Sequence, residues 1–99
     1  MEINITEAHP TVITIKGRLD TVNASDFEKA INPILEGDMK EVVVDCTALN
    51  YISSSGLRLF LTLQKTAAAK QGALSLKGVT SEIMEIFDIT GFSAIFRFI

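Results

Sequence analysis

The sequence predicts one α/β domain with a mixed, mostly parallel sheet. The chain has 99 residues, of which 47% are hydrophobic and 21% charged, as expected of one folded domain with one core. Segments with the two-residue period of strands alternate with segments of helical period. This alternation favours parallel strands joined by right-handed crossovers. The expected order within residues 1–99 is β-β-α-β-α-β-α-β.

The chain begins with a predicted hairpin. Residues 3–6 and 11–17 alternate apolar and polar side chains and are rich in β-branched residues. The polar break between them contains Pro10, which suits a turn. We expect Gly17-Arg18-Leu19-Asp20 to close the second strand.

A helix is predicted from Asn23 to Gly37. Its apolar residues recur at 27, 30, 31, 34 and 35, which places them on one helical face. Asn23 is a suitable N-cap, and Asp26 lies in the first turn, where negative charge is favourable. Pro33 removes a backbone donor, so we expect a kink or a tightened last turn.

The remaining elements continue the alternation. The continuously apolar Val42-Val43-Val44 is typical of a strand covered on both faces. After it we expect a helix over 54–71 that ends at Gly72, a strand over 73–77, a short helix between the cap Thr80 and Gly91, and a final strand over 94–99.

Composition argues against several classes of function. Nine basic and twelve acidic residues give a net charge of −3, and the bases are dispersed, so we expect no nucleic-acid partner. One cysteine and one histidine cannot form an internal disulfide and make a poor metal set. No apolar run reaches the ~18 residues of a membrane span, and the N-terminus does not resemble a secretory signal. We therefore expect a soluble, cytoplasmic protein without membrane contacts.

We expect the functional site to lie between the central strand and the longest helix. In open α/β sheets, ligands and partners meet the carboxyl ends of the strands, which directs attention to residues 45–56. Leu49 and Ile52 can pin this segment to the core, and three serines and a glycine then open a helix. The helix N-terminus offers unpaired N–H groups and partial positive charge.

The residues alone leave several interpretations of these serines open. Ser53 or Ser54 can be an N-cap, with Gly56 permitting close packing. A nucleophile elbow with Ser54 would need glycine at position 52, where Ile52 stands, and His9 lies in the first hairpin turn. No phosphate-binding loop motif occurs. A phosphorylated serine is the third interpretation.

Two other polar residues have plainer interpretations. Cys46 follows a buried strand and is expected to be a small core residue. Asp45 is expected to accept hydrogen bonds at the strand end rather than to act as an acid catalyst. Phe92, Phe96 and Phe98 are expected to pack against the sheet.

Five segments together resemble the STAS domain of anti-sigma-factor antagonists, over essentially the whole chain. They are Gly17-Arg18-Leu19-Asp20, Val43-Val44-Asp45, Tyr51-Ile52-Ser53-Ser54-Ser55-Gly56-Leu57, Leu74-Ser75-Leu76 and Phe87-x-x-Thr90-Gly91-Phe92. In that family the central signature is Asp-Ser-Ser/Thr-Gly-Leu, and the serine after the aspartate accepts phosphate. The resemblance implies that Ser54 is the phosphorylation site, with Ser53 at the aspartate position. It also implies a partner-binding surface made of Asp20, Thr21, Ser53, Ser55, Gly56 and Leu57.

The resemblance implies a regulatory protein rather than an enzyme. The unphosphorylated protein would bind an anti-sigma factor that is also a serine kinase, and so release the sigma factor. Phosphorylation of Ser54 would end this binding, and a serine phosphatase would restore it. ATP and Mg²⁺ would belong to the kinase, so no cofactor is expected for this chain. The alternative, favoured by Ser53 in place of aspartate, is a STAS module that docks on a transporter ATPase without phosphorylation.

Overall fold

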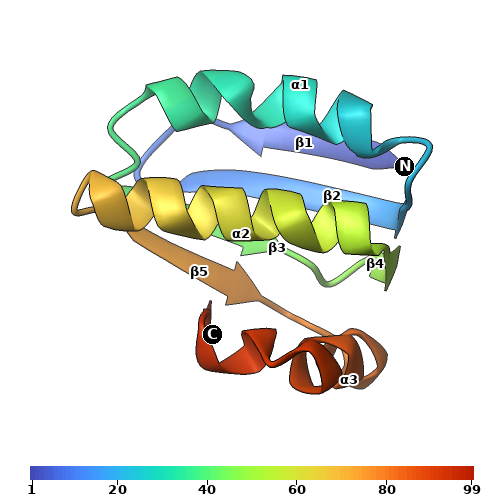
Figure 1. Cartoon of the computed structure of the whole chain (residues 1–99). Helices are drawn as coiled ribbons and strands as arrows, with labels where there is room; N and C mark the ends of the chain where they lie inside the picture. The colour runs from blue at the N-terminus through green and yellow to red at the C-terminus, as the bar shows by residue number, and fades with distance from the viewer.

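A six-stranded sheet forms the centre of the computed structural model, which describes residues 1–99 (Figure 1). Helices α1 and α2 run side by side across one face of the sheet, and α3 follows beyond β5 (Figure 1). The elements are β1 (Glu2–Thr6), β2 (Thr11–Leu19), α1 (Ala24–Glu36), β3 (Glu41–Asp45), β4 (Leu49–Ile52), α2 (Ser54–Ala69), β5 (Ala73–Lys77), α3 (Ser81–Thr90), the 3₁₀ turn η1 (Phe92–Ala94) and β6 (Arg97–Phe98).

The sheet confirms the predicted mixed topology. Its order is β1-β2-β3-β5-β6, with β4 paired to β2 off this path. The β1–β2 pair is antiparallel, and all other pairs are parallel. The opening hairpin thus supplies the antiparallel edge, and the α/β crossovers supply the rest.

Strand β4 was missing from the predicted order, and this is a correction. Its four residues bury only the first and last side chains, a spacing of three that occurs on a helical face and does not show the alternation of a strand. Pairing decides its conformation: residues 11–14 of β2 pair with β3, and residues 17–19 pair with β4. No local pattern in the sequence predicts that β2 pairs with two different strands along its length.

Strand β2 ends within the predicted segment Gly17-Arg18-Leu19-Asp20, because its last residue is Leu19. The register of the β2–β4 ladder shifts between Gly17 and Arg18, and Gly17 has φ +91°, a backbone conformation that favours glycine. Gly17 therefore supplies a bulge inside a continuing strand.

Helix α1 buries the predicted apolar face, including Phe27, Ile31 and Ile34. It continues through Pro33, and the N–H of Gly37 donates to the carbonyl of Ile34 at 3.1 Å, three residues back. The last turn is therefore tightened, which was one of the two expected outcomes. The prediction of a side-chain N-cap is wrong, because Asn23 occupies the N-cap position without making a capping hydrogen bond to the helix.

Helix α2 ends at Ala69, two residues before the predicted boundary. The ammonium group of Lys70 then donates to the carbonyls of Leu35 and Gly37 and so ties the end of α2 to the end of α1. Gly72 follows where two backbones nearly touch: a Cβ on Gly72 would lie 1.8 Å from the carbonyl oxygen of Met39. Close approach, and not only helix termination, requires this glycine.

The C-terminal segment is less extended than predicted. Residues 92–94 form η1, and the strand covers only Arg97–Phe98, so the expected strand over 94–99 is wrong in extent. Helix α3 matches its predicted signals. Thr80 accepts a hydrogen bond from the N–H of Ile83 at 3.4 Å, and Gly91 ends the helix with φ +79°.

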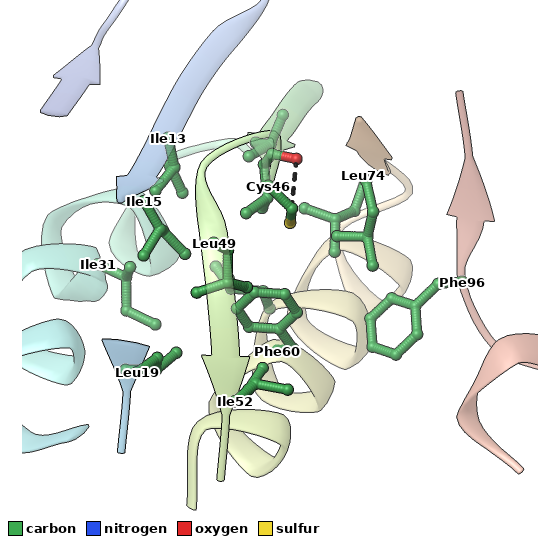
Figure 2. Packing of buried hydrophobic residues seen from close by; sticks show 14 of the residues in the cluster. Ile13, Ile15, Leu19, Ile31, Cys46, Leu49, Ile52, Phe60, Leu74 and Phe96 are labelled. Atoms are coloured by element: carbon green, nitrogen blue, oxygen red, sulfur yellow. Dashed lines mark hydrogen bonds between the residues drawn. The ribbon is translucent and has the colours of Figure 1, made fainter. Parts of the chain in front are cut away.

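The core lies between the sheet and its helices (Figure 2). Phenylalanine rings connect its parts: the ring centroids of Phe27 and Phe60 are 5.9 Å apart, and those of Phe60 and Phe87 are 6.3 Å apart. Phe96 continues the series at 5.5 Å from Phe87. None of the helices has both the length and the apolar character that a membrane crossing requires.

Cys46 is a core residue, as predicted. Its side chain is fully buried beside the strand ends (Figure 2), and burial raises the pKa of the thiol to about 12. The thiolate is therefore not populated near neutral pH, so Cys46 packs as a small hydrophobic residue.

Candidate functional site

Two loops meet at the edge of the sheet where β2 and β4 end. The parallel ladder pairs Leu19 with Ile52, and the N–H of Ser53 donates to the carbonyl of Leu19 at 2.8 Å. The segment after β2 and the start of α2 therefore lie next to one another. This is the carboxyl edge of the sheet, where α/β folds commonly place their sites.

The first loop, residues 20–23, is held by reciprocal hydrogen bonds. Oδ1 of Asp20 accepts from the N–H groups of Val22 and Asn23, both at 3.0 Å. In return Oδ1 of Asn23 accepts from the N–H of Asp20 at 2.8 Å, the arrangement of a capping box. This explains why Asn23 does not cap α1: its amide also donates to the carbonyl of Arg18.

The loop fixes its own shape and presents its tip to solvent. Thr21 is exposed, and Val22 is 88% exposed, although it is apolar. Asp20 is half-buried, because its carboxylate faces the loop backbone.

Three consecutive serines open α2 in three different environments. Ser53 is 7% exposed, and its Oγ accepts from the N–H of Gly56 at 3.2 Å, so Ser53 is the N-cap. Ser54 is the first helical residue; its side chain is exposed and its hydroxyl makes no hydrogen bond within the protein. Ser55 is half-buried. Of the two serines that could cap the helix, the structure thus assigns the role to Ser53.

Gly56 and Leu57 support the start of the helix from below. A Cβ on Gly56 would lie 2.8 Å from Cγ of Leu19 and 2.9 Å from Cγ1 of Ile52, so the helix packs directly on the ends of β2 and β4. Leu57 is 5% exposed and belongs to the core. Both residues position the serines, and both are buried.

Two shallow hollows flank the start of α2. One, of about 250 Å³, lies against α3 and η1 and is lined by Ser54, Leu57, Arg58, Leu61, Thr90 and Phe92. The other, of about 200 Å³, lies against α1 and is lined by Ala24, Ser25, Glu28, Ser55, Arg58 and Leu59. Arg58 borders both hollows and is exposed.

The charges around the serines are sparse. Helix α2 carries no acidic residue in its first turn, and the one ion pair of the protein, Lys16 with Glu2 at 3.7 Å, lies on the β1–β2 hairpin.

Asp45 accepts from the hydroxyl of Thr47 at 2.7 Å and from its N–H at 3.0 Å. These bonds hold the pKa of Asp45 below its ordinary value, as suits the predicted role of a strand-end acceptor.

The structure does not bring a histidine to the serines. His9 precedes the start of β2, whereas Ser54 follows the end of β4, and the two strands are parallel, so the residues lie at opposite ends of the sheet. No group of three or more His, Cys, Asp or Glu side chains gathers where a metal ion could be held. The geometry therefore offers Ser54 neither an imidazole base nor a metal site.

The residues proposed from the sequence form two groups. Ser54, Thr21 and, in part, Ser55 and Asp20 reach the surface, whereas Ser53 is buried beneath it, as are Gly56 and Leu57. Sequence reasoning missed Val22 and Arg58. The four-residue spacing from Ser54 to Arg58, one helical turn, was the available signal for Arg58.

Comparison with known proteins extends this description. The sequence profile of the STAS domain matches residues 1–99. BtrV of Bordetella bronchiseptica, named as a candidate anti-sigma factor antagonist, is 33% identical over 85 residues, which cover 86% of this chain and 73% of BtrV.

Two solved structures share the fold. An anti-sigma-factor antagonist (STAS) domain protein from Planctomyces limnophilus superimposes with a TM-score of 0.87 at 22% identity, covering 97% of this chain and 87% of the other. The phosphorylated form of the Bacillus cell fate determinant SpoIIAA superimposes with a TM-score of 0.76 at 18% identity, covering 99% and 91%. At these identities the likeness concerns the fold.

Proposed function

The chain belongs to the STAS domain family of anti-sigma factor antagonists, and on that premise we propose that it works by partner switching. Unphosphorylated, it binds an anti-sigma factor that is also a serine kinase, and the sigma factor is released. Phosphorylation of Ser54 ends this binding, and a serine phosphatase restores it. The observation that carries the proposal is the exposed, unbonded hydroxyl of Ser54 beside the 20–23 loop.

The position of Ser54 suits a phosphate acceptor. Its Oγ forms a bond to the γ-phosphorus of ATP held by the kinase, the bond from that phosphorus to ADP breaks, and the hydroxyl proton passes to a base of the kinase. Because Ser53 caps the helix, Ser54 is free to react without loss of a structural hydrogen bond. ATP and Mg²⁺ are bound by the kinase, and this chain supplies the hydroxyl.

The phosphate would act on docking and spare the fold. It adds a charge of about −1.5 to −2 at the first residue of α2, where the helix dipole favours negative charge. In a docked interface the same group would lose water beside the half-buried carboxylate of the adjacent loop, Asp20. A mispaired interfacial charge costs ~2–5 kcal/mol, which weakens binding by tens to thousands of fold.

The surface that would contact the anti-sigma factor is small and mostly preformed. Thr21, Val22 and Ser54 lie exposed on two backbone segments that are tied together by the Ser53–Leu19 hydrogen bond. Ser53, Gly56 and Leu57 hold the surface from below. Because the proposed partners are an anti-sigma factor and a serine phosphatase that acts on this chain, we expect the protein in the cytoplasm.

The proposal is tested by intact-mass measurement after incubation with the cognate kinase and ATP, followed by peptide mapping. We expect one added phosphate on Ser54, none on Ser54→Ala, and undiminished phosphorylation of Ser55→Ala, the matched neighbour. A phosphate that maps to Ser55 or Ser53 would show that this serine, and not Ser54, is the acceptor. Complete absence of phosphate would show that the protein is not regulated by phosphorylation.

A second candidate function is docking on a transporter ATPase without phosphorylation. It is favoured by Ser53, which caps α2 where a phosphorylated family member carries aspartate. Affinity purification from the native host separates the two functions. Recovery of a kinase-type anti-sigma factor supports partner switching, and recovery of a transporter ATPase with unmodified Ser54 supports the second candidate.

A further inference from the structure

We propose that Arg58 receives the phosphate placed on Ser54, so that the modified protein holds its own phosphate against α2. This inference rests on the proposed phosphorylation of Ser54 and adds a residue that the switch depends on. Arg58 would be a positioning residue: it would lower the pKa of the phosphate and fix its place on the helix surface.

The spacing of the two residues is the first support. Ser54 and Arg58 are four residues apart in α2, so their side chains lie on the same face one turn apart. Both border the hollow against Thr90 and Phe92. An anion one turn before a cation is the favourable orientation of such a pair, because each charge also suits the helix dipole better than the reverse order.

The second support is that Arg58 has no partner in the unmodified protein. Its guanidinium makes no hydrogen bond and no ion pair, since the one ion pair joins Lys16 and Glu2. Glu28 of α1 borders the other hollow with Arg58, yet the two groups form no ion pair. Helix α2 contains no acidic residue. The guanidinium of Arg58 therefore has no competing anion and is available to a phosphate one turn before it.

The chemistry of the two groups also fits. A guanidinium presents its N–H donors in a planar fork that matches phosphate oxygens, so it can form two parallel charge-assisted hydrogen bonds. The residue before Ser54 adds no opposing charge, because Ser53 is a neutral, buried hydroxyl that accepts from Gly56. The phosphate would therefore meet the guanidinium of Arg58 one turn along the helix, and the residue before it would add no negative charge.

The test places phosphoserine at position 54 during synthesis, so that no natural kinase is needed. The second pKa of the phosphate is followed by ³¹P NMR at low salt in the parent, in Arg58→Gln and in Lys65→Gln. Lys65→Gln is the matched control. It removes the same charge from an exposed position of the same helix, about three turns from Ser54. The dipole of α2 acts equally in all three proteins and cancels from the comparison.

We expect Arg58→Gln to raise the second pKa of the phosphate by about 0.2–0.4, which follows from the usual strength of such helical pairs. Lys65→Gln should leave it unchanged. Thermal melts should show that phosphoserine raises the melting temperature of the parent and raises that of Arg58→Gln less. Equal pKa values in the two variants, or equal gains in melting temperature, would overturn the proposal.

This outcome is separate from that of the proposed function. If no kinase modifies Ser54 but Arg58→Gln shifts the phosphate pKa, the proposed phosphorylation switch is wrong, while the interaction between Arg58 and a phosphate on Ser54 is confirmed. If the kinase modifies Ser54 and the variants titrate alike, the switch stands and Arg58 has no part in it.

Discussion

At the scale of single residues, adjacent serines in this protein differ in what they are free to do. The buried hydroxyl of Ser53 accepts a hydrogen bond from the N–H of Gly56, whereas the hydroxyl of Ser54, the first helical residue, is exposed and makes no hydrogen bond. The difference follows from the backbone: the N-cap residue is still extended, so its side chain can turn back to the helix end. One residue later the side chain points outward.

Substitution of Ser54 separates folding from docking. Ser54→Asp adds an anion at the favourable end of α2, so its free energy of unfolding should match or slightly exceed that of the parent. Its affinity for the anti-sigma factor should fall at least tenfold by isothermal titration calorimetry. Ser54→Ala should retain the parent affinity. Tight binding by Ser54→Asp would refute the explanation by charge.

Asp45 makes stability depend on pH. Hydrogen bonds from Thr47 lower the pKa of Asp45 in the folded protein below the ordinary value of 3.8, while neighbouring Lys77 acts in the same direction. The stabilisation is therefore complete above pH ~4 and is lost as the pH falls through the folded pKa. The unfolding free energies of the parent and Asp45→Ala, measured by urea titration, should differ most near pH 7 and converge in acid. A difference that grows in acid would contradict this account.

At the scale of elements, the contact between α2 and the strand ends depends on the absence of a side chain. Gly56→Ala places a methyl group within 3 Å of Leu19 and Ile52, so α2 or the strand ends must shift. We expect a loss of ~1–3 kcal/mol in the free energy of unfolding, measured by chemical denaturation. Gly37→Ala is the control, because its Cβ would meet nothing closer than 3.4 Å. Equal stabilities of the two variants would show that α2 is not in close contact there.

The pairing of β2 with β4 also determines that the serines at the start of α2 lie beside the 20–23 loop. The last residue of the 20–23 loop, Asn23, and the first residue of α2, Ser54, are 31 positions apart in the chain (54 − 23). The two segments meet only because β2 and β4 pair in parallel. The loop keeps its form through the reciprocal bonds of Asp20 and Asn23. A partner that contacts both segments therefore detects the folded sheet edge, and neither peptide alone reproduces it.

At the scale of the whole molecule, one core connects the sheet to all three helices. Phe60 of α2 contacts the rings of Phe27 in α1 and Phe87 in α3, and Phe87 contacts the C-terminal Phe96 and Phe98. The buried cluster has 21 members without a break between the helices. Unfolding should therefore be a single cooperative transition, with α3 included.

Phe87→Ala tests this connection. It removes a fully buried ring that joins α3 to the rest, so we expect a loss of ~3–5 kcal/mol. Urea unfolding of the parent, followed by far-ultraviolet circular dichroism and by the fluorescence of Tyr51 in β4, should give coincident curves. Separate transitions in the parent would show that α3 folds independently of the core.

Local patterns were sufficient for much of this structure. The three helices and the longer strands follow from apolar periodicity, and the cap Thr80 follows from residue type at a helix start. For α2 the sequence offered Ser53 or Ser54 as the cap, and the structure selects Ser53. The buried Cys46 and the hydrogen-bonded Asp45 were likewise predicted. In each case the deciding interaction lies within a few residues, so the sequence contains it directly.

Only the tertiary structure decided the rest. Strand β4 exists because β2 offers it a partner, Asn23 serves the 20–23 loop instead of α1, and Gly72 is needed because a distant carbonyl approaches it. The inward orientation of Gly56 and Leu57, and the meeting of Ser54 with the loop after β2, depend on how α2 lies on the sheet. These features arise from contacts between segments far apart in the chain, and a local pattern carries no record of which distant segment will lie beside it.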